Sequence, residues 1–233
     1  KEINIGDFLV VPKLSLKEKF NNIKFSSDLC ELIGIFVAEG SVYLNDSHQR
    51  GSRGHVYFSV GEEPELIERI KVLMKNCFRL NTSKMAVRKM KGQKGYQISY
   101  YNLSVARFFA NKCYDKAPHL AYNKIFPEET LLLPEEKLSS LIKGYFKGDG
   151  HFSKSSNRKK INFTTVSEKL AWQTRFVLHE LGIYSHLQFR KKSSTSFILG
   201  RKVNQRNGWA VWITGNDQIS YFLNLISDQK NNQ

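Results

Sequence analysis

The fold is decided by Leu141-Ile142-Lys143-Gly144-Tyr145-Phe146-Lys147-Gly148-Asp149-Gly150, a stretch with an earlier copy in Leu32-Ile33-Gly34-Ile35-Phe36-Val37-Ala38-Glu39-Gly40. Aligned on their closing glycines, both copies read apolar, any, Gly, apolar, Phe, any, small, acid, Gly. The two acids lie almost half the chain apart. This spacing indicates that the chain consists of two similar halves.

Each copy has the features of an α-helix that ends at its closing glycine. Apolar residues recur at helical spacing, and Gly40 and Gly150 occupy the position after the helix, where glycine is common. Each copy also has two small residues four positions apart, which places them on one helix face. These pairs are Gly34 with Ala38 and Gly144 with Gly148. Glycine inside a helix costs about 0.5–1 kcal/mol relative to alanine, so we expect the two helices to pack closely through these faces.

The acids of the two copies predict a metal site. Glu39 and Asp149 stand at helix C-termini, where the helix dipole disfavours a negative charge by about 0.3–1 kcal/mol. Packing the helices side by side would also bring the two carboxylates together and add repulsion. A bound divalent cation would relieve both problems, and hard cations such as Mg²⁺ prefer carboxylate, carbonyl and water oxygens.

The paired motifs resemble the LAGLIDADG motifs of single-chain homing endonucleases. The resemblance covers about residues 26–230. It implies an α+β fold, a pseudo-two-fold duplicated αββαββα arrangement in which two antiparallel sheets form a DNA-binding saddle. It also implies that Glu39 and Asp149, with the carbonyl groups of Ala38 and Gly148, hold Mg²⁺, for which Mn²⁺ can substitute. Glu39 is one methylene longer than the family's usual aspartate, so we expect it to hold the metal with a different geometry in that half.

The composition points to a nucleic-acid partner. The chain has 233 residues and a formal net charge of +15, from 36 Lys and Arg against 21 Asp and Glu. An excess of this size favours binding to a polyanion, nucleic acid before membrane. No apolar run approaches transmembrane length and no signal peptide is visible. The three scattered cysteines indicate small core residues in a reducing compartment, so we expect an intracellular protein and leave its compartment open.

The remaining patterns predict the same order of elements in both halves. Each motif helix is followed by two strands, a helix, two strands and a last helix. We divide the chain into an N-terminal strand and linker (1–25), a first half (26–125) and a second half (126–233), with a long basic loop at 191–207. The run Gly6-Asp7-Phe8-Leu9-Val10-Val11-Pro12 is similar to the stretch that leads from an intein splicing domain into its inserted endonuclease. An ordinary strand and linker explains this run equally well.

One face of each expected sheet is left for a partner, because the helices cover the other face. The side chains expected there are polar or basic, they include no acid, and such side chains can read base edges in a major groove. They are His55, Tyr57, Ser59, Lys84, Arg88, Gln97, Ser99, Lys160, Asn162, Thr164, His186, Gln188 and Arg190. The segments that join the strands are basic, and we expect their cations to contact phosphates. These cations are Arg50, Arg53, Lys154, Arg158, Lys192 and Arg201. A slip of one residue in strand register would invert each face.

Lys124 is a candidate catalytic residue. It opens Lys124-Ile125-Phe126-Pro127, and intein-type members of the family carry a similar Lys-x-x-Pro element whose lysine helps catalysis near the metals. A lysine near the scissile phosphate could stabilise developing charge or polarise the attacking water. The alternative is a surface lysine in a basic chain.

The resemblance implies a site-specific homing endonuclease, a divalent-metal-dependent phosphodiester hydrolase that makes double-strand breaks in a long DNA target. We expect a monomer that binds double-stranded DNA. Two alternatives use the same scaffold: a maturase that binds intron RNA, and a catalytically inactive, sequence-specific DNA-binding regulator. The sequence leaves intron and intein origins both open.

Overall fold

The computed structural model describes residues 25–45, 51–80, 85–92, 94–155, 158–192, 196–198, 201–203 and 206–227. Residues 1–24 of the expected N-terminal segment lie outside the described residues, and so do the predicted DNA contacts Arg50 and Lys84.

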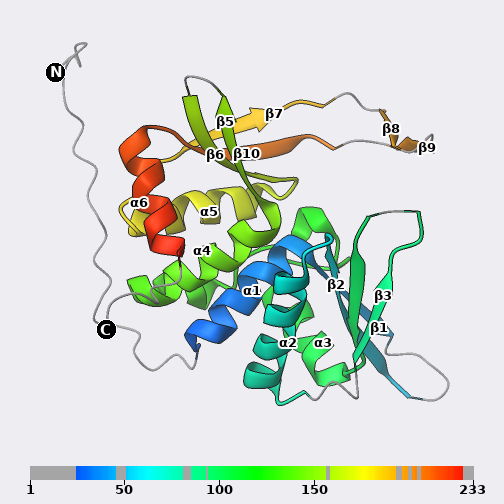
Figure 1. Ribbon diagram of the computed structural model, residues 1–233. Helices are drawn as coiled ribbons and strands as arrows, with labels where there is room; N and C mark the ends of the chain where they lie inside the picture. Colours follow the sequence, from blue (N-terminus) through cyan, green and yellow to red (C-terminus); the bar gives the residue numbers. More distant parts are fainter. Residues whose placement is uncertain are drawn as a thin grey trace, which may run out of the picture.

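The two halves share one order of elements and one sheet topology (Figure 1). The first half contains α1 (Ser27–Glu39), β1 (Gly40–Asn45), β2 (Arg53–Val60), α2 (Pro64–Phe78), β3 (Met85–Lys89), β4 (Tyr96–Tyr100) and α3 (Leu103–Lys112). The second half contains α4 (Glu135–Asp149), β5 (Gly150–Ser155), β6 (Arg158–Thr165), α5 (Glu168–Glu180), β7 (His186–Arg190), β10 (Gly208–Ile213) and α6 (Asn216–Ile226). The strand orders, β1-β2-β4-β3 and β5-β6-β10-β7, are equivalent, and all pairs are antiparallel. The expected duplicated α+β fold is therefore confirmed.

Local signals account for the helix starts. Ser26 and Ser167 precede α1 and α5, and their hydroxyls accept hydrogen bonds from the backbone N–H groups of Leu29 and Leu170. Each serine satisfies a helix N–H that has no partner within the helix. Pro64 begins α2, where its missing N–H costs nothing.

The connection between the halves has short helices, and the expected basic loop at 191–207 is partly ordered into strands. Two 3₁₀ turns, η2 (Ala121–Asn123) and η3 (Glu128–Leu132), precede α4. Within 191–207, β8 (Ser196–Ile198) pairs with β9 (Arg201–Val203) as an antiparallel hairpin, so the prediction of a loop throughout was wrong. The basic and polar sequence of this segment lacks the apolar alternation from which strands are predicted.

The centre of the molecule is the seam between α1 and α4, which lie side by side between the two sheets (Figure 1). A Cβ atom added to Gly34 would lie 2.2 Å from the Leu141 carbonyl oxygen, and one added to Gly144 would lie 2.0 Å from the Glu31 carbonyl oxygen. The helix backbones are therefore in contact at both glycines. This confirms the packing that the small residues predicted.

The closing glycines are needed for a different reason from the one expected. Gly40 has φ −87° and Gly150 has φ −78°, so neither adopts the left-handed conformation expected of a glycine after a helix. Instead, a Cβ atom at Gly40 would lie 2.2 Å from the Phe36 ring and 2.5 Å from its carbonyl oxygen. Gly150 has the same relation to Phe146, at 2.1 and 2.4 Å. Each motif phenylalanine thus folds back over the glycine that ends its own helix.

Matching aromatic contacts fill the core beneath each sheet. Phe36 packs edge-on against Phe58 of β2, with ring centroids 6.0 Å apart, and Phe146 packs against Phe163 of β6 at 5.8 Å. Phe58 and Phe163 are also the strand partners of the two closing glycines. The duplication is therefore preserved in the core contacts as well as in the order of elements.

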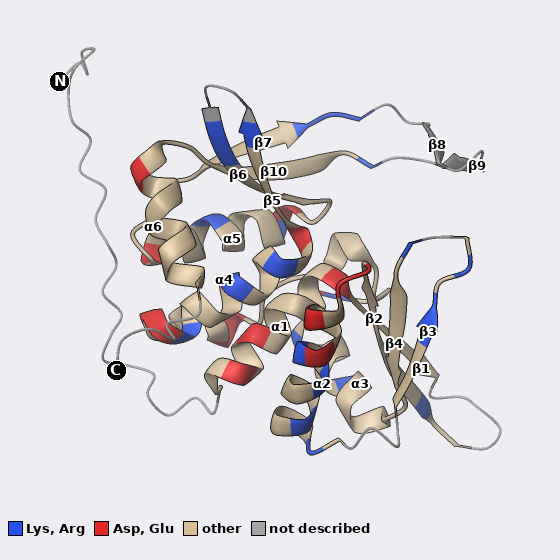
Figure 2. Ribbon diagram, viewed as in Figure 1, with Lys and Arg blue, Asp and Glu red and all other residues tan. Residues whose placement is uncertain are grey.

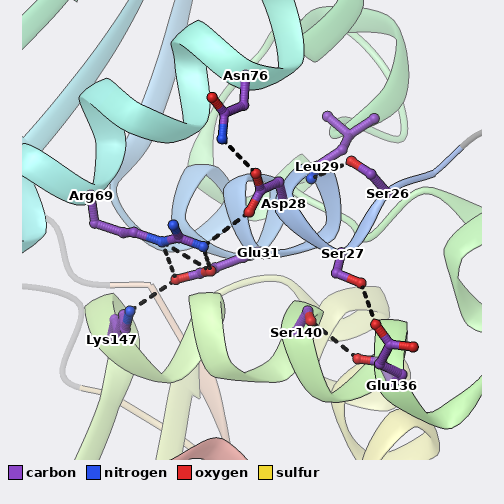
Figure 3. Close-up of polar contacts among 10 residues, drawn as sticks. All are labelled: Ser26, Ser27, Asp28, Leu29, Glu31, Arg69, Asn76, Glu136, Ser140 and Lys147. Atoms are coloured by element: carbon purple, nitrogen blue, oxygen red, sulfur yellow. Dashed lines mark hydrogen bonds and ion pairs between the residues drawn. The ribbon is translucent and has the colours of Figure 1, made fainter. Parts of the chain in front are cut away.

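A buried carboxylate joins three helices on the outer side of the seam (Figure 3). Glu31 of α1 is 4% exposed, and the Nε of Arg69 on α2 donates to both of its oxygens at 3.2 Å. Lys147 of α4 donates to the same carboxylate at 2.8 Å. Burial opposes ionisation, but the hydrogen bonds from Arg69 and Lys147 hold the pKa of Glu31 below its usual value. The charged network therefore fixes α2 against the central pair.

The cysteines are thiols, as expected. Cys30 and Cys113 are fully buried in the core, and Cys77 packs against it. Burial raises the pKa of Cys30 to about 12 and that of Cys77 to about 11. The neutral forms suit their role as small apolar residues.

Candidate active site and nucleic-acid interface

The two motif acids meet at the same end of the central seam. Glu39 is the last residue of α1 and Asp149 is the last residue of α4. A Cβ atom at Gly148 would lie 2.5 Å from the Ala38 Cβ and 2.8 Å from the Glu39 Cγ. The absence of a side chain at Gly148 thus makes room for the Glu39 side chain beside the end of α4.

The environment of the two acids disfavours their ionised forms. Burial raises the pKa of Asp149 from 3.8 to about 7; nearby Lys124 opposes this shift and the charge of Glu39 adds to it. Burial also raises the pKa of Glu39, against the influence of Lys124. Two partly buried carboxyl groups at helix C-termini are poorly stabilised as anions. A bound cation would stabilise their ionised forms, so the pair is suited to a cation site.

Lys124 lies in this site and is not a surface residue. It is 9% exposed, and its Nζ donates to the carbonyl oxygens of Val37 at 2.9 Å and Ala38 at 3.3 Å. These carbonyls belong to the last turn of α1, where helix carbonyls lack partners within the helix. Burial lowers the pKa of Lys124, while Asp149 and Glu39 act in the opposite direction. The structure thus brings together the three residues that the sequence singled out as candidate catalytic groups.

Lys124 is held in place from both halves of the molecule. Its carbonyl oxygen accepts a hydrogen bond from the hydroxyl of Ser167 at 2.7 Å. The next two residues bond to different halves. The N–H of Ile125 donates to the Cys113 carbonyl in the first half, and the N–H of Phe126 donates to the Gln173 side chain in the second half. The segment that carries the lysine is therefore fixed across the expected boundary at 125/126.

The oxygen donors at this site suit a hard divalent cation. Within the described residues, no group of three or more His, Cys, Asp or Glu side chains is placed to hold a metal. The carboxylates of Glu39 and Asp149 would therefore need carbonyl, water or phosphate oxygens to complete a coordination shell. The carbonyls of Ala38 and Gly148 adjoin the two acids in the chain, although the Ala38 oxygen already accepts from Lys124.

We expect the metal-free protein to lose stability relative to Asp149→Asn as the pH rises from about 4 to about 7. A carboxyl whose pKa is about 7 when folded and 3.8 when unfolded binds more protons in the folded state, so rising pH favours unfolding between these values. The slope is at most about 1.4 kcal/mol per pH unit. Melting curves of both proteins in EDTA below and above this range test it. A constant difference in Tm between the two proteins would contradict it.

The open face of the first sheet carries the side chains that the sequence placed there. Val56, Phe58 and Val60 of β2 are buried in the core, whereas His55, Tyr57 and Ser59 alternate with them and are partly exposed. The strand register puts Arg88 opposite Gln97, and Gln97 opposite Ser59, on the same face. Ser99 shares this face through its pairing with Tyr57 but is only 2% exposed, so its neighbours shield the predicted base contact.

The open face of the second sheet has the predicted register. Ile161 and Phe163 of β6 are buried in the core, and the residues that alternate with them face away from the helices. Those predicted residues are Lys160, Asn162 and Thr164 on β6, and His186, Gln188 and Arg190 on β7. Asn162 is 8% exposed and its amide donates to the Thr164 hydroxyl, so its side chain is engaged within the sheet.

Two sets of residues on these faces were not identified from the sequence. Trp212 of β10 pairs with both Asn162 and His186, which places its indole in the middle of the second open face. On the first sheet, His55 contacts the rings of Tyr43 and Tyr101 at 5.5 and 4.7 Å. An aromatic residue in a strand is more often a core residue, and only the register shows that Tyr43 and Trp212 point outward.

The cations expected to contact phosphates lie at the ends of the strands. Arg53, Lys154 and Lys192 are exposed, while Arg158 and Arg201 begin β6 and β9. Figure 2 shows basic residues on the strands and on the helices, whereas the acidic residues lie on the helices and on connections such as the one that leads into α2. Among the described residues of β1 to β7 and β10, none is acidic. The sheets therefore present a positive surface suited to a phosphate backbone.

A family model matches part of the second half of the chain, and solved structures match its fold. Residues 136–227 match the LAGLIDADG-like domain. The structure of the homing endonuclease I-DmoI in complex with DNA and Ca superposes with a TM-score of 0.61 at 16% identity, covering 87% of this chain and 91% of that one. The N-terminal LAGLIDADG domain of DUF199/WhiA superposes with a TM-score of 0.52 at 16% identity, covering 90% of this chain and 88% of that one. At these identities the superpositions show a shared fold.

The curated relatives are much longer proteins. The chain is 28% identical over 78% of its length to the uncharacterized protein MJ0043 of Methanocaldococcus jannaschii, of which it spans 23%. It is 28% identical to the ATP-dependent DNA helicase Hel308 of the same organism, over 84% of this chain and 15% of the helicase. It is 29% identical to a DNA polymerase of Thermococcus litoralis, over 70% of this chain and 8% of the polymerase. No helix in the described part of the chain has the length and apolar character needed to cross a bilayer.

Proposed function

We propose that the chain belongs to the LAGLIDADG family and is a site-specific DNA endonuclease of the homing type. The observation that carries the proposal is the convergence of Glu39, Asp149 and buried Lys124 at the joined ends of the two motif helices. A binding scaffold has no need of two carboxyl groups whose pKa values are raised by burial beside a buried lysine. Carboxyl groups with a raised pKa beside a specific charged partner are typical of catalytic sites.

We propose Mg²⁺ as the cofactor, with Mn²⁺ able to replace it. Glu39 and Asp149 would hold it together with main-chain, water or phosphate oxygens, and the structures of I-DmoI with DNA include complexes with Ca, Mn or Mg. Divalent ions in such a site activate water and stabilise the leaving oxygen of a phosphodiester. The ionised carboxylates needed for binding form as the pH rises through the raised pKa of Asp149.

The protein's own contribution to the reaction is charge and position. The Lys124 ammonium lies near both acids and is fixed by the carbonyls at the end of α1. A cation held there can stabilise negative charge that develops on a phosphate without first having to be ordered. The open sheet faces would position duplex DNA, so that the scissile phosphates of the two strands come to the end of the seam.

We propose further that the chain derives from an inserted element such as an intein. Its relatives include a helicase and a DNA polymerase, proteins of different chemistry, and the matched part is a small share of each. A segment that recurs in unrelated proteins supports an element that moves between genes. Residues 6–12 are similar to the stretch that leads from an intein splicing domain into its endonuclease, and this short similarity also supports an intein origin.

Selection from a plasmid library with random inserts tests the nuclease. We expect double-strand cleavage at one class of sequence with Mg²⁺ or Mn²⁺, and no cleavage in EDTA. Sequence-selective binding in Ca²⁺ without cleavage in either active metal would overturn the nuclease and favour a DNA-binding regulator. Binding to a structured intron RNA in preference to any duplex would favour a maturase.

Binding to the selected duplex should be monomeric and strongly dependent on salt. The net charge of +15 and the basic strand ends predict contacts to about six or more phosphates. The affinity should then fall by roughly a thousandfold between 50 and 200 mM salt. Titrations at several salt concentrations, with sedimentation of the complex, measure both quantities. An affinity independent of salt, or a protein dimer on one duplex, would contradict this expectation.

A further inference from the structure

Trp212 organises a cluster of side chains on the open face of the second sheet. Two cations approach the indole, with the Lys160 Nζ 5.6 Å and the Arg190 guanidinium carbon 5.1 Å from its ring centroid. The His186 ring is nearly parallel to the indole, at 14° and 6.5 Å. The indole Nε1 donates to the Gln188 Oε1 at 3.1 Å. We call Lys160, Gln188 and Arg190 the donor cluster.

The indole fixes which way the Gln188 amide points. An indole N–H can only donate, so the amide atom that faces it must be the carbonyl oxygen. The amide NH₂ of the exposed Gln188 side chain is therefore turned away from Trp212, with two hydrogens available. A glutamine free to rotate could offer both a donor and an acceptor to a base, but here the acceptor is already engaged.

All outward-facing groups of the donor cluster are consequently hydrogen-bond donors. Lysine and arginine carry no acceptor, and both contact the same indole that donates to Gln188. The first sheet differs, because His55 Nδ1 and the Tyr57 hydroxyl pair at 2.9 Å and each of these residues can donate or accept. The pair formed by His55 and Tyr57 is therefore not restricted to donors.

We propose that the donor cluster selects guanine in the part of the DNA site bound by the second sheet, an inference that rests on the proposed function. In the major groove guanine offers two adjacent acceptors, N7 and O6. Adenine offers N7 beside the N6 donor, and cytosine offers the N4 donor, which would face the donors of the cluster. An unmatched donor pair loses its hydrogen bonds to water, so both of these bases are rejected.

The test is selection of bound duplexes from a random library by the full chain in Ca²⁺, followed by the same selection with two variants. We expect guanine at one or more positions in one half of the wild-type site. Gln188→Glu keeps an acceptor for the indole but replaces the outward donors with an acceptor, so one of these positions should change to cytosine. Trp212→Phe keeps an aromatic ring but frees the amide to rotate, so the preference for guanine over adenine should fall about tenfold.

Gln97→Glu in the first sheet is the matched control, because it makes the same change on the other open face. It should alter positions only in the opposite half of the site. Failure of Gln188→Glu to alter any position, or a wild-type site without guanine in the half that this variant affects, would overturn the inference. Neither result would contradict the proposed nuclease activity, because cleavage in Mg²⁺ is measured separately. Guanine selection by a protein that never cleaves would support the inference and contradict the proposed nuclease activity. A lack of any sequence preference would overturn both.

Discussion

Gly144→Ala should lower the melting temperature of the protein even though alanine is the better helix former. Propensity alone predicts a gain of about 0.5–1 kcal/mol. However, the added Cβ would lie 2.0 Å from the Glu31 carbonyl oxygen, a backbone atom that can move only if α1 and α4 separate. Overpacking of this kind costs about 1–3 kcal/mol or more, which corresponds to a decrease in Tm of roughly 2–12 °C for a chain of this size. Gly144→Leu and Gly34→Leu should be more destabilising still.

Gly61→Ala is the control for the change of residue. The nearest atom to its added Cβ is the Glu63 carboxylate oxygen at 3.2 Å, the end of a flexible side chain. Its Tm should stay within about 2 °C of wild type, as for surface substitutions in general. Because the seam joins the two halves, the Gly144 variants should still unfold in one transition. A Gly144→Ala protein as stable as wild type would show that the helix backbones are not in contact.

The sequence predicted the seam and the sheet faces because both depend on short periodic patterns. Small residues four apart identify a close helix contact, and alternation along β2 and β6 identifies the face away from the core. These patterns are local, so they can be recognised without knowledge of the fold. The duplicated motif then supplied the tertiary arrangement, since the same elements follow each copy.

The features that escaped prediction depend on contacts between distant residues. Lys124 was a candidate, but the sequence did not predict its hydrogen bonds to the carbonyls of α1. These carbonyls lie more than eighty residues earlier in the chain. Ser99 and Asn162 have the expected register and are nevertheless almost fully buried. Trp212 resembles a core residue until its strand partners are known. The closing glycines were recognised, but the sequence suggested a left-handed backbone where the structure has a phenylalanine ring folded over each glycine.

Asp149→Asn and Glu39→Gln should each abolish double-strand cleavage, or lower its rate by at least about a hundredfold, while leaving specific DNA binding largely intact. Each change keeps the size of the side chain and removes a charge that would hold the cation. Binding should survive because the contacts to DNA lie on the sheet faces and not at the end of the seam. Cleavage in Mg²⁺ and affinity in Ca²⁺ for the selected duplex measure the two effects. Glu65→Gln, an exposed acid in the first turn of α2, is a control with the same change in net charge.

Stability separates a catalytic role of these acids from a structural one. Both carboxyl groups have a pKa raised by burial, so at neutral pH their charge works against folding. Replacing either with its amide should therefore leave the metal-free protein at least as stable as wild type while cleavage is lost. Acids that served to hold the helix ends would give the opposite pattern, a lower Tm in EDTA with cleavage retained. Full double-strand cleavage by one variant would remove that acid from the active site, and full cleavage by both would disprove the proposed nuclease mechanism.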